Sequence, residues 1–301
     1  MKFVTYEEKG LNHVGLLIQN GTEILPLAEA ESSLFGTANI PDNMSEIIKS
    51  EDEILPIIEA LKEKFAVNPC QTLRINTVNL LAPIPRPAKN IFCVGLNYRD
   101  HVKEAEGCLD HPKVPKFPVI FSKAPTTVTG PDSIVKSFSE IVTQLDYEVE
   151  LAVIIGKKGL AIKKEKAYEH IFGYTIINDV SARNLQFQHS QWLMGKSCDT
   201  FAPMGPCLVH KSAIPNPQDL DIKCKVNGEV RQSSNTKNMI FDIPTIIETI
   251  SSVITLEPGD IIATGTPSGV GLGFNPPKYL NSGDVMELEI TDIGILRNTI
   301  E

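Results

Sequence analysis

Paired cysteines are missing from this chain of 301 residues, and the missing pairs exclude two classes of site. Its six cysteines are scattered and none forms a C-x-x-C pair: Cys70, Cys93, Cys108, Cys198, Cys207 and Cys224. This spacing excludes a zinc knuckle and a thioredoxin motif. In a chain of this size, scattered cysteines are typical of a reducing cytosol rather than of a disulfide framework. We therefore predict a cytoplasmic protein.

Positive charge and long apolar runs are also scarce. Lysine and arginine number 28 against 37 acidic residues, a net charge of -9, which argues against nucleic acid or an anionic membrane as the main partner. No apolar stretch approaches the roughly 20 residues of a membrane helix. Because Glu7 and Glu8 precede any apolar run, we expect no signal peptide.

Local patterns divide the chain into a small N-terminal domain, residues 1–85, and a larger domain, residues 86–301. Asn20-Gly21 between two apolar runs predicts a hairpin. Ser50 and Glu53 are spaced as a capping box ahead of a helical apolar pattern. The prolines of the PIPRP segment, residues 83–87, favour extended backbone and mark the boundary.

The larger domain is rich in expected strands, with helices predicted over residues 164–173 and 244–254. Residues 284–291 (DVMELEIT) alternate as a strand with one apolar face. Since the order of elements lacks a regular βαβα rhythm, we predict a mixed α+β, β-rich fold in which the N-terminal domain is α/β.

Two glutamates open an apolar strand in the segment QLDYEVELAVIIGK. Glu148 and Glu150 are two apart, so their side chains share a face. The same spacing recurs at Glu287 and Glu289, where both carboxylates are expected to face water. At Glu148 the strand continues without alternation, which indicates burial on both faces, and buried carboxylates need a partner. The pair is therefore either the solvated start of a strand or half of a metal site.

A third carboxylate, Asp179, ends the next apolar strand-like run, FGYTIIND. Two glutamates and one aspartate are hard oxygen ligands, and such a set suits Mg²⁺ or Mn²⁺. The alternative is a surface acid beside a helix N-terminus, where aspartate is favoured in any case.

Five ordered motifs resemble the fumarylacetoacetate hydrolase family: FCVGLNYRDHVKEA, LDYEVELAVIIGK, YTIINDVSARNLQ, QWLMGKSCDTFAPMGP and IIATGTPSGVG. They span roughly residues 90 to 275. The resemblance is strongest to the bacterial branch that acts on oxaloacetate-like 2-oxo acids. It implies the family's mixed β-sandwich or roll as the catalytic fold, a small 2-oxo acid as substrate, and a homodimer.

The resemblance also implies roles for single residues. Glu148, Glu150 and Asp179 match the family's metal ligands, and Lys196 matches a lysine that neutralises charge beside the metal. His101 and Glu104 match a His-Glu dyad on a mobile segment of the family. Arg183, Gln186 and Thr266 match residues that contact the substrate.

The residues themselves allow a simpler interpretation of several of these positions. His101 and Glu104 are three apart, so on a helix they share a face, where the carboxylate would raise the basicity of the imidazole; a solvated charged face is the alternative. The segment around them, residues 95–107, has a glycine at each end, as suits a segment that closes over a ligand. Lys196 alone would be interpreted as an exposed charge. Trp192 and His189 are expected to pack or to line a wall.

These observations predict a metal-dependent enzyme that breaks a C–C bond of a small 2-oxo acid, with oxaloacetate decarboxylation to pyruvate as the first hypothesis. Hydrolysis of an acylpyruvate or fumarylpyruvate, with His101 and Glu104 activating water, is the alternative within enzymes. From another class, the chain would be a metabolite-binding or scaffold protein that acts through a partner.

Overall fold

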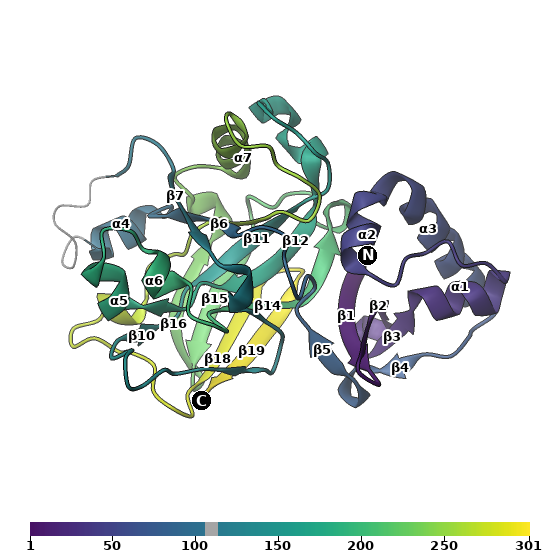
Figure 1. Cartoon of the computed structure of the whole chain (residues 1–301), viewed down its shortest axis with the longest axis horizontal. Helices are drawn as coiled ribbons and strands as arrows, with labels where there is room; N and C mark the ends of the chain where they lie inside the picture. Colours follow the sequence, from purple (N-terminus) through teal and green to yellow (C-terminus); the bar gives the residue numbers. More distant parts are fainter. Residues whose placement is uncertain (106–113) are drawn as a thin grey trace.

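One large sheet runs through the computed structural model, which describes residues 1–105 and 114–301 (Figure 1). Within those residues the sheet has twelve strands. Ten follow one path, in the order β4 (Leu73–Arg74), β3 (Glu23–Pro26), β2 (Leu11–Ile18), β1 (Lys2–Glu8), β14 (Ala202–His210), β12 (Ile171–Asn178), β11 (Val149–Ile155), β17 (Ile261–Ala263), β6 (Ile91–Gly95) and β7 (Val119–Lys123). The other two lie beside this path: β5 (Asn79–Leu81) pairs with β1, and β8 (Val128–Thr129) pairs with β14.

Strand β1 joins the N-terminal part to the rest of the molecule. It pairs antiparallel with β14, with Lys2 opposite Val209 and Phe3 opposite Leu208. Figure 1 shows the N-terminal strands and helices on one side of the molecule, next to this junction. The predicted small domain therefore continues the sheet of the larger one, and the boundary at residue 85 stays a prediction.

A second sheet packs against the first and completes a β-sandwich. In the described chain it has five strands: β16 (Glu229–Asn235), β15 (Asp221–Val226), β18 (Val285–Ile290), β19 (Gly294–Ile300) and β9 (Ile134–Val135). On β18, Met286, Leu288 and Ile290 are buried, which confirms the predicted alternation. One buried apolar cluster contains side chains from both sheets. The predicted mixed, β-rich fold class is confirmed.

The helices lie around these sheets and in the N-terminal part: α1 (Leu27–Phe35), α2 (Met44–Lys49), α3 (Glu51–Val67), α4 (Arg99–Ala105), α5 (Arg183–Gln188), α6 (Leu193–Lys196) and α7 (Ile243–Ser251). Helix α3 starts after Ser50 as predicted, but the Ser50 side chain makes no capping hydrogen bond. Helix α7 confirms the helix expected near residues 244–254. No described helix has the length and apolar character needed to cross a lipid bilayer.

The hairpin at Asn20-Gly21 is confirmed, whereas the helix predicted over residues 164–173 is confirmed only in part, as a shorter 3-10 helix. Strands β2 and β3 pair antiparallel around Asn20 and Gly21, both with positive φ. In residues 164–173 a 3-10 helix covers only Lys164–His170, and Gly173 lies inside β12. A Cβ on Gly173 would collide with the carbonyl of Val209 on the next strand. The glycine thus permits close strand pairing rather than ending a helix.

Candidate active site

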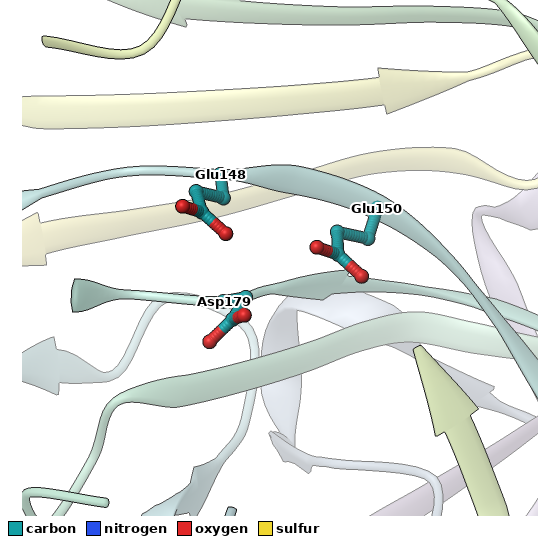
Figure 2. Close-up of side chains that lie close together, drawn as sticks. All are labelled: Glu148, Glu150 and Asp179. Carbon is teal, nitrogen blue, oxygen red and sulfur yellow. The ribbon is translucent and has the colours of Figure 1, made fainter. Parts of the chain in front are cut away.

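Strands β11 and β12 bring three carboxylates together. Their antiparallel register places Val149 opposite Asn178, and the Asp179 N–H donates to the Glu148 carbonyl at 2.9 Å. Glu148 and Glu150 point to the same side of β11, toward Asp179 (Figure 2). One carboxylate oxygen from each residue lies within 4.8 Å of the others, and all three residues are buried. All of β11 is buried, as the sequence predicted.

Lys196 closes one side of this cluster. Its Nζ lies 2.8 Å from Glu148 Oε2 and 2.8 Å from Asp179 Oδ2, and the side chain is 2% exposed. Burial lowers the pKa of Lys196, but the charges of Asp179 and Glu148 outweigh it and leave a net raised pKa. Lys196 is therefore a protonated, buried partner of the carboxylates and not an exposed surface charge.

Glu148 and Glu150 have opposite electrostatic environments. Burial alone would raise the pKa of Glu148, but Lys196 and Arg183 lower it to about 2. Burial, with the charges of Asp179 and Glu148, raises the pKa of Glu150 well above its ordinary value. Glu150 accepts a hydrogen bond from the Gly265 N–H at 2.7 Å, and no lysine or arginine of residues 1–105 or 114–301 forms a salt bridge with it.

This donor set fits a divalent cation. Three converging carboxylates are hard oxygen ligands of the kind that Mg²⁺ and Mn²⁺ prefer. Burial and the two neighbouring carboxylates raise the pKa of Glu150, and the charge of Lys196 does not offset them. A cation among Glu148, Glu150 and Asp179 would supply further positive charge.

Arg183 lies at the start of α5 and is held by several acceptors. Its Nε donates to Asp146 Oδ2 at 2.9 Å and its Nη1 to Gln186 Oε1 at 3.0 Å. Its Nη2 lies 2.7 Å from Glu148 Oε1, within ion-pair distance, although the N–H is not aligned for a hydrogen bond there. Arg183 thus places a guanidinium beside the carboxylate cluster, with its Nη2 nitrogen outside any hydrogen bond of the described residues.

The predicted dyad is formed on α4. His101 Nδ1 lies 3.0 Å from Glu104 Oε2, and the two side chains are 12% and 14% exposed. Glu104 Oε1 accepts from the Gly269 N–H at 2.8 Å. In the tautomer in which the Nδ1–H group donates a hydrogen bond to this carboxylate, Nε2 is the basic nitrogen. Glu106 and Gly107, at the end of the predicted closing segment, lie outside the described residues.

A cavity joins the dyad to the carboxylate cluster. Its polar lining includes eight of the nine predicted site residues, namely His101, Glu104, Glu148, Glu150, Arg183, Gln186, Lys196 and Thr266. The ninth, Asp179, lies behind them and is fully buried. The apolar wall is formed by side chains that include Phe121, Phe187, Trp192, Val270 and Leu272. Trp192 therefore lines a wall, as expected.

The Thr266 hydroxyl is already engaged by the protein. It donates to the Val149 carbonyl at 3.0 Å and accepts from Gln232 Nε2 at 2.8 Å. These bonds fix the side chain at the cavity wall. Its predicted contact with a substrate carboxylate stays a prediction.

Sequence reasoning missed two buried charges next to the site, Lys123 and Asp146. Lys123 ends β7, and its Nζ lies 2.6 Å from Asp179 Oδ1 with neither side chain exposed. A lysine at the end of a short strand gives no sign of burial. Asp146 is two and four residues before Glu148 and Glu150 and is also fully buried. The continuous D-x-E-x-E spacing was a signal that could have found it.

Comparison with known proteins identifies the family. The model of the fumarylacetoacetate (FAA) hydrolase C-terminal domain matches residues 90–301. The chain belongs to the fumarylacetoacetate hydrolase family. Oxaloacetate tautomerase YisK of Bacillus subtilis (strain 168) is 50% identical to it over 305 aligned residues, which cover 100% of both chains. The family and the branch predicted from the motifs are thus confirmed.

Solved structures of the fumarylacetoacetate hydrolase family share the fold. Fumarylacetoacetate hydrolase (EaFAH) from psychrophilic Exiguobacterium antarcticum is 40% identical, covers 100% of this chain and 99% of its own, and has a TM-score of 0.84. Maleylpyruvate hydrolase from Sphingobium sp. SYK-6, in complex with manganese (II) ion and pyruvate, is 29% identical, covers 100% of this chain and 98% of its own, and has a TM-score of 0.77. These relatives are enzymes.

Proposed function

We propose that the chain catalyses the keto–enol tautomerisation of oxaloacetate, with Mg²⁺ or Mn²⁺ held by Glu148, Glu150 and Asp179. The observation that supports it best is the single cavity in which the His101–Glu104 dyad faces the buried carboxylate cluster. A general base and a cation site in one cavity suit proton removal next to a carbonyl. The full-length similarity to an enzyme named oxaloacetate tautomerase points to the same reaction.

The cationic side chains of the site would bind and orient the substrate. Arg183 and Lys196 are buried cations beside the cluster, and they would hold the carboxylates of a dicarboxylic oxo acid. A bound divalent cation would supply Lewis acidity toward the C2 carbonyl of the substrate. The apolar wall, with Phe121 and Trp192, would exclude water from the reacting carbons.

His101 would transfer the proton. In the keto-to-enol direction its Nε2 takes a proton from C3, and the electron pair of the C3–H bond forms the C2=C3 double bond. The imidazolium, stabilised by Glu104, then gives a proton to the C2 oxygen. One C–H bond is broken, one O–H bond is formed, and His101 returns to its starting state.

The test measures enol absorbance of oxaloacetate against the spontaneous rate, with Mg²⁺ or Mn²⁺ in parallel. We expect acceleration that EDTA abolishes reversibly and that His101→Gln lowers about 100-fold. His13→Gln is the matched control, because His13 pairs with Asp42 at 2.6 Å outside the cavity, and it should retain full activity. Full activity of a metal-stripped sample would contradict the proposal.

Decarboxylation of oxaloacetate is the second candidate. Its product would be pyruvate, the molecule bound with manganese in the maleylpyruvate hydrolase neighbour, although that enzyme is named for hydrolysis. In decarboxylation the C3–C4 bond breaks and CO₂ leaves, and the electron pair of that bond forms the C2=C3 double bond of the pyruvate enolate. A proton added at C3 then gives pyruvate, and no attack by water is needed. The same samples assayed for pyruvate separate the two reactions, and acetylpyruvate as substrate tests hydrolysis. No change with any of these substrates would favour the metabolite-binding or scaffold hypothesis.

We also propose that the protein is a homodimer. An apolar groove between residues 138–142 and α5–α6 includes Ile141, Leu193 and Met194, which are 62%, 44% and 56% exposed. Two copies that pair through this surface would each cover the exposed apolar side chains of the other. Met194→Glu should shift the mass measured by light scattering to that of a monomer. Val253→Glu, at an 82% exposed position on another surface, should not; a monomeric parent protein would refute the dimer.

A cytoplasmic location is proposed on the state of the thiols. The five described cysteines are all free, and Cys93, Cys207 and Cys224 are buried; Cys108 lies outside the described residues. Free thiols suit a reducing compartment. Recovery of the protein in the soluble cytoplasmic fraction of its cells is expected, and recovery from a secreted fraction would contradict this.

A further inference from the structure

The carboxylate of Asp146 lies next to two parts of the site, the Arg183 guanidinium and the glycine-rich segment that contacts Glu104. Its Oδ1 accepts from the N–H of Tyr147 at 2.9 Å and of Gly271 at 2.6 Å. Its Oδ2 accepts from Arg183 Nε at 2.9 Å and from the Leu272 N–H at 3.0 Å. The side chain is fully buried. Four donors from three separate segments thus converge on one side chain.

The segment Gly269–Gly273 lies between Asp146 and the dyad. At one end the Gly269 N–H donates to Glu104 Oε1, and two residues later the Gly271 N–H donates to Asp146. A Cβ on Gly271 would lie 2.7 Å from Asp146 Oδ1, and a Cβ on Gly273 would overlap the Glu104 carboxylate. Both carboxylates therefore contact the backbone of this segment directly.

Asp146 also sets the direction of Arg183. Because Nε is held by Asp146 and Nη1 by Gln186, the remaining nitrogen Nη2 lies within ion-pair distance of Glu148 Oε1, at 2.7 Å. Without Asp146, the guanidinium would lose its buried counter-charge on the side away from the cavity.

We propose that Asp146 is a positioning residue that couples the guanidinium of Arg183 to the His101–Glu104 dyad through the segment Gly269–Gly273. It touches no substrate and acts only through these neighbours. The inference rests on the proposed function for its effect on catalysis, whereas the coupling itself is a property of the protein alone.

Hydrogen–deuterium exchange of the whole protein with Asp146→Asn tests the coupling without any assay of activity. The asparagine is nearly isosteric, but its NH₂ must face two of the four donors, so at least two hydrogen bonds are lost. We expect amides of residues 269–273 and of residues 99–104 to exchange about tenfold faster or more. Unchanged exchange over residues 99–104 would overturn the proposal.

Asp260→Asn is the matched control, because Asp260 is also buried and is held by Lys89 at 2.8 Å and by the Glu257 N–H at 2.8 Å. It lies beside Ile155, at the opposite end of β11 from the carboxylate cluster. The control variant should leave exchange in both segments unchanged; equal acceleration there would show a general loosening and would also overturn the proposal. If Asp146→Asn does not fold, Gly271→Ala is the second variant, because its methyl group would lie 2.5 Å from the Lys278 carbonyl oxygen and 2.7 Å from Asp146 Oδ1. It should displace the segment from Asp146 and produce the same pattern.

Kinetics with oxaloacetate and Mn²⁺ provide the second measurement. Asp146→Asn should raise KM about tenfold, through Arg183, and lower kcat about tenfold, through the dyad. A change in KM alone would contradict the coupling. If the parent protein does not accelerate tautomerisation, the proposed function fails, and the exchange experiment still decides the role of Asp146.

Discussion

Lys123 and Asp179 form an ion pair that is closed to solvent, with Nζ 2.6 Å from Oδ1 and no exposed surface on either side chain. Lys196 holds the other carboxylate oxygen at 2.8 Å. The two lysines come from different elements, β7 and α6. Asp179 is therefore fixed in orientation by a partner on each oxygen.

Replacement of Lys123 by methionine should strongly destabilise the protein. The change leaves a buried carboxylate with one of its two partners missing, which costs about 3 kcal/mol. Urea denaturation measures the loss in the free energy of unfolding. Lys49→Met, which breaks an exposed pair with Glu46, should lose less than about 0.5 kcal/mol. Equal losses in the two variants would show that burial does not set the strength of the pair.

Glu150→Gln should change stability in opposite directions with and without a divalent cation. In metal-free protein burial, together with the charges of Asp179 and Glu148, disfavours the ionised form of Glu150 and raises its pKa. The neutral amide of glutamine avoids this cost, so the free energy of unfolding should rise by about 1 kcal/mol. In Mn²⁺ the parent protein should gain stability and the variant should gain much less. Thermal unfolding with and without Mn²⁺ measures both effects, and an equal gain in the two proteins would refute a role of Glu150 in cation binding.

The contact between Glu51 and His210 should make stability depend on acidic pH. Burial raises the pKa of Glu51, but hydrogen bonds from His210 and Lys211, at 3.1 Å and 2.8 Å, outweigh it and lower that pKa. A lowered pKa in the folded state stabilises above the unfolded value of about 4.3, and the contribution is lost as pH falls through the folded value.

Glu51→Gln should therefore lower the free energy of unfolding by about 1 kcal/mol near pH 6, and the difference should shrink as pH falls below about 4. Urea titrations over this range measure it. Glu53→Gln, in the same first turn of α3 but exposed, should show a difference below about 0.5 kcal/mol at every pH. A Glu51→Gln difference that grows toward low pH would contradict the sign.

Substitutions at Gly95 and Trp192 should compensate each other, because the two residues are in direct contact. A Cβ on Gly95 would lie 2.6 Å from the Trp192 ring, which packs edge-on against Phe121 with ring centroids 5.3 Å apart. Gly95→Ala should displace the ring from the cavity wall and reduce kcat/KM for oxaloacetate about tenfold. Trp192→Phe in the same protein should recover part of the loss, because the smaller ring makes room. A double variant no better than Gly95→Ala would exclude this steric cause.

The carboxylate cluster could be predicted from the sequence because its parts follow local rules. Glu148 and Glu150 share a face by the two-residue period of a strand. Asp179 comes directly after the neighbouring strand β12, whose antiparallel pairing with β11 brings it back beside Glu148. The five motifs added the dyad and Lys196, which no local pattern distinguishes from surface charges.

What the sequence did not predict depends on contacts between distant segments. Lys123 becomes a buried partner only because β7 and the end of β12 meet in the fold. Residues 164–173 have a helical composition, yet pairing of β12 with β14 takes Gly173 into the sheet. In both places tertiary packing decides the outcome and local propensity does not.

The pairing of β1 with β14 has a consequence for shortened forms of the protein. A chain that started near residue 86 would keep the whole cavity but would leave the backbone N–H and C=O groups of β14 around Leu208 and Val209 without their neighbour. An uncovered strand edge of this kind recruits other chains. Truncation should therefore yield aggregates, and the first strand protects the solubility of the catalytic part.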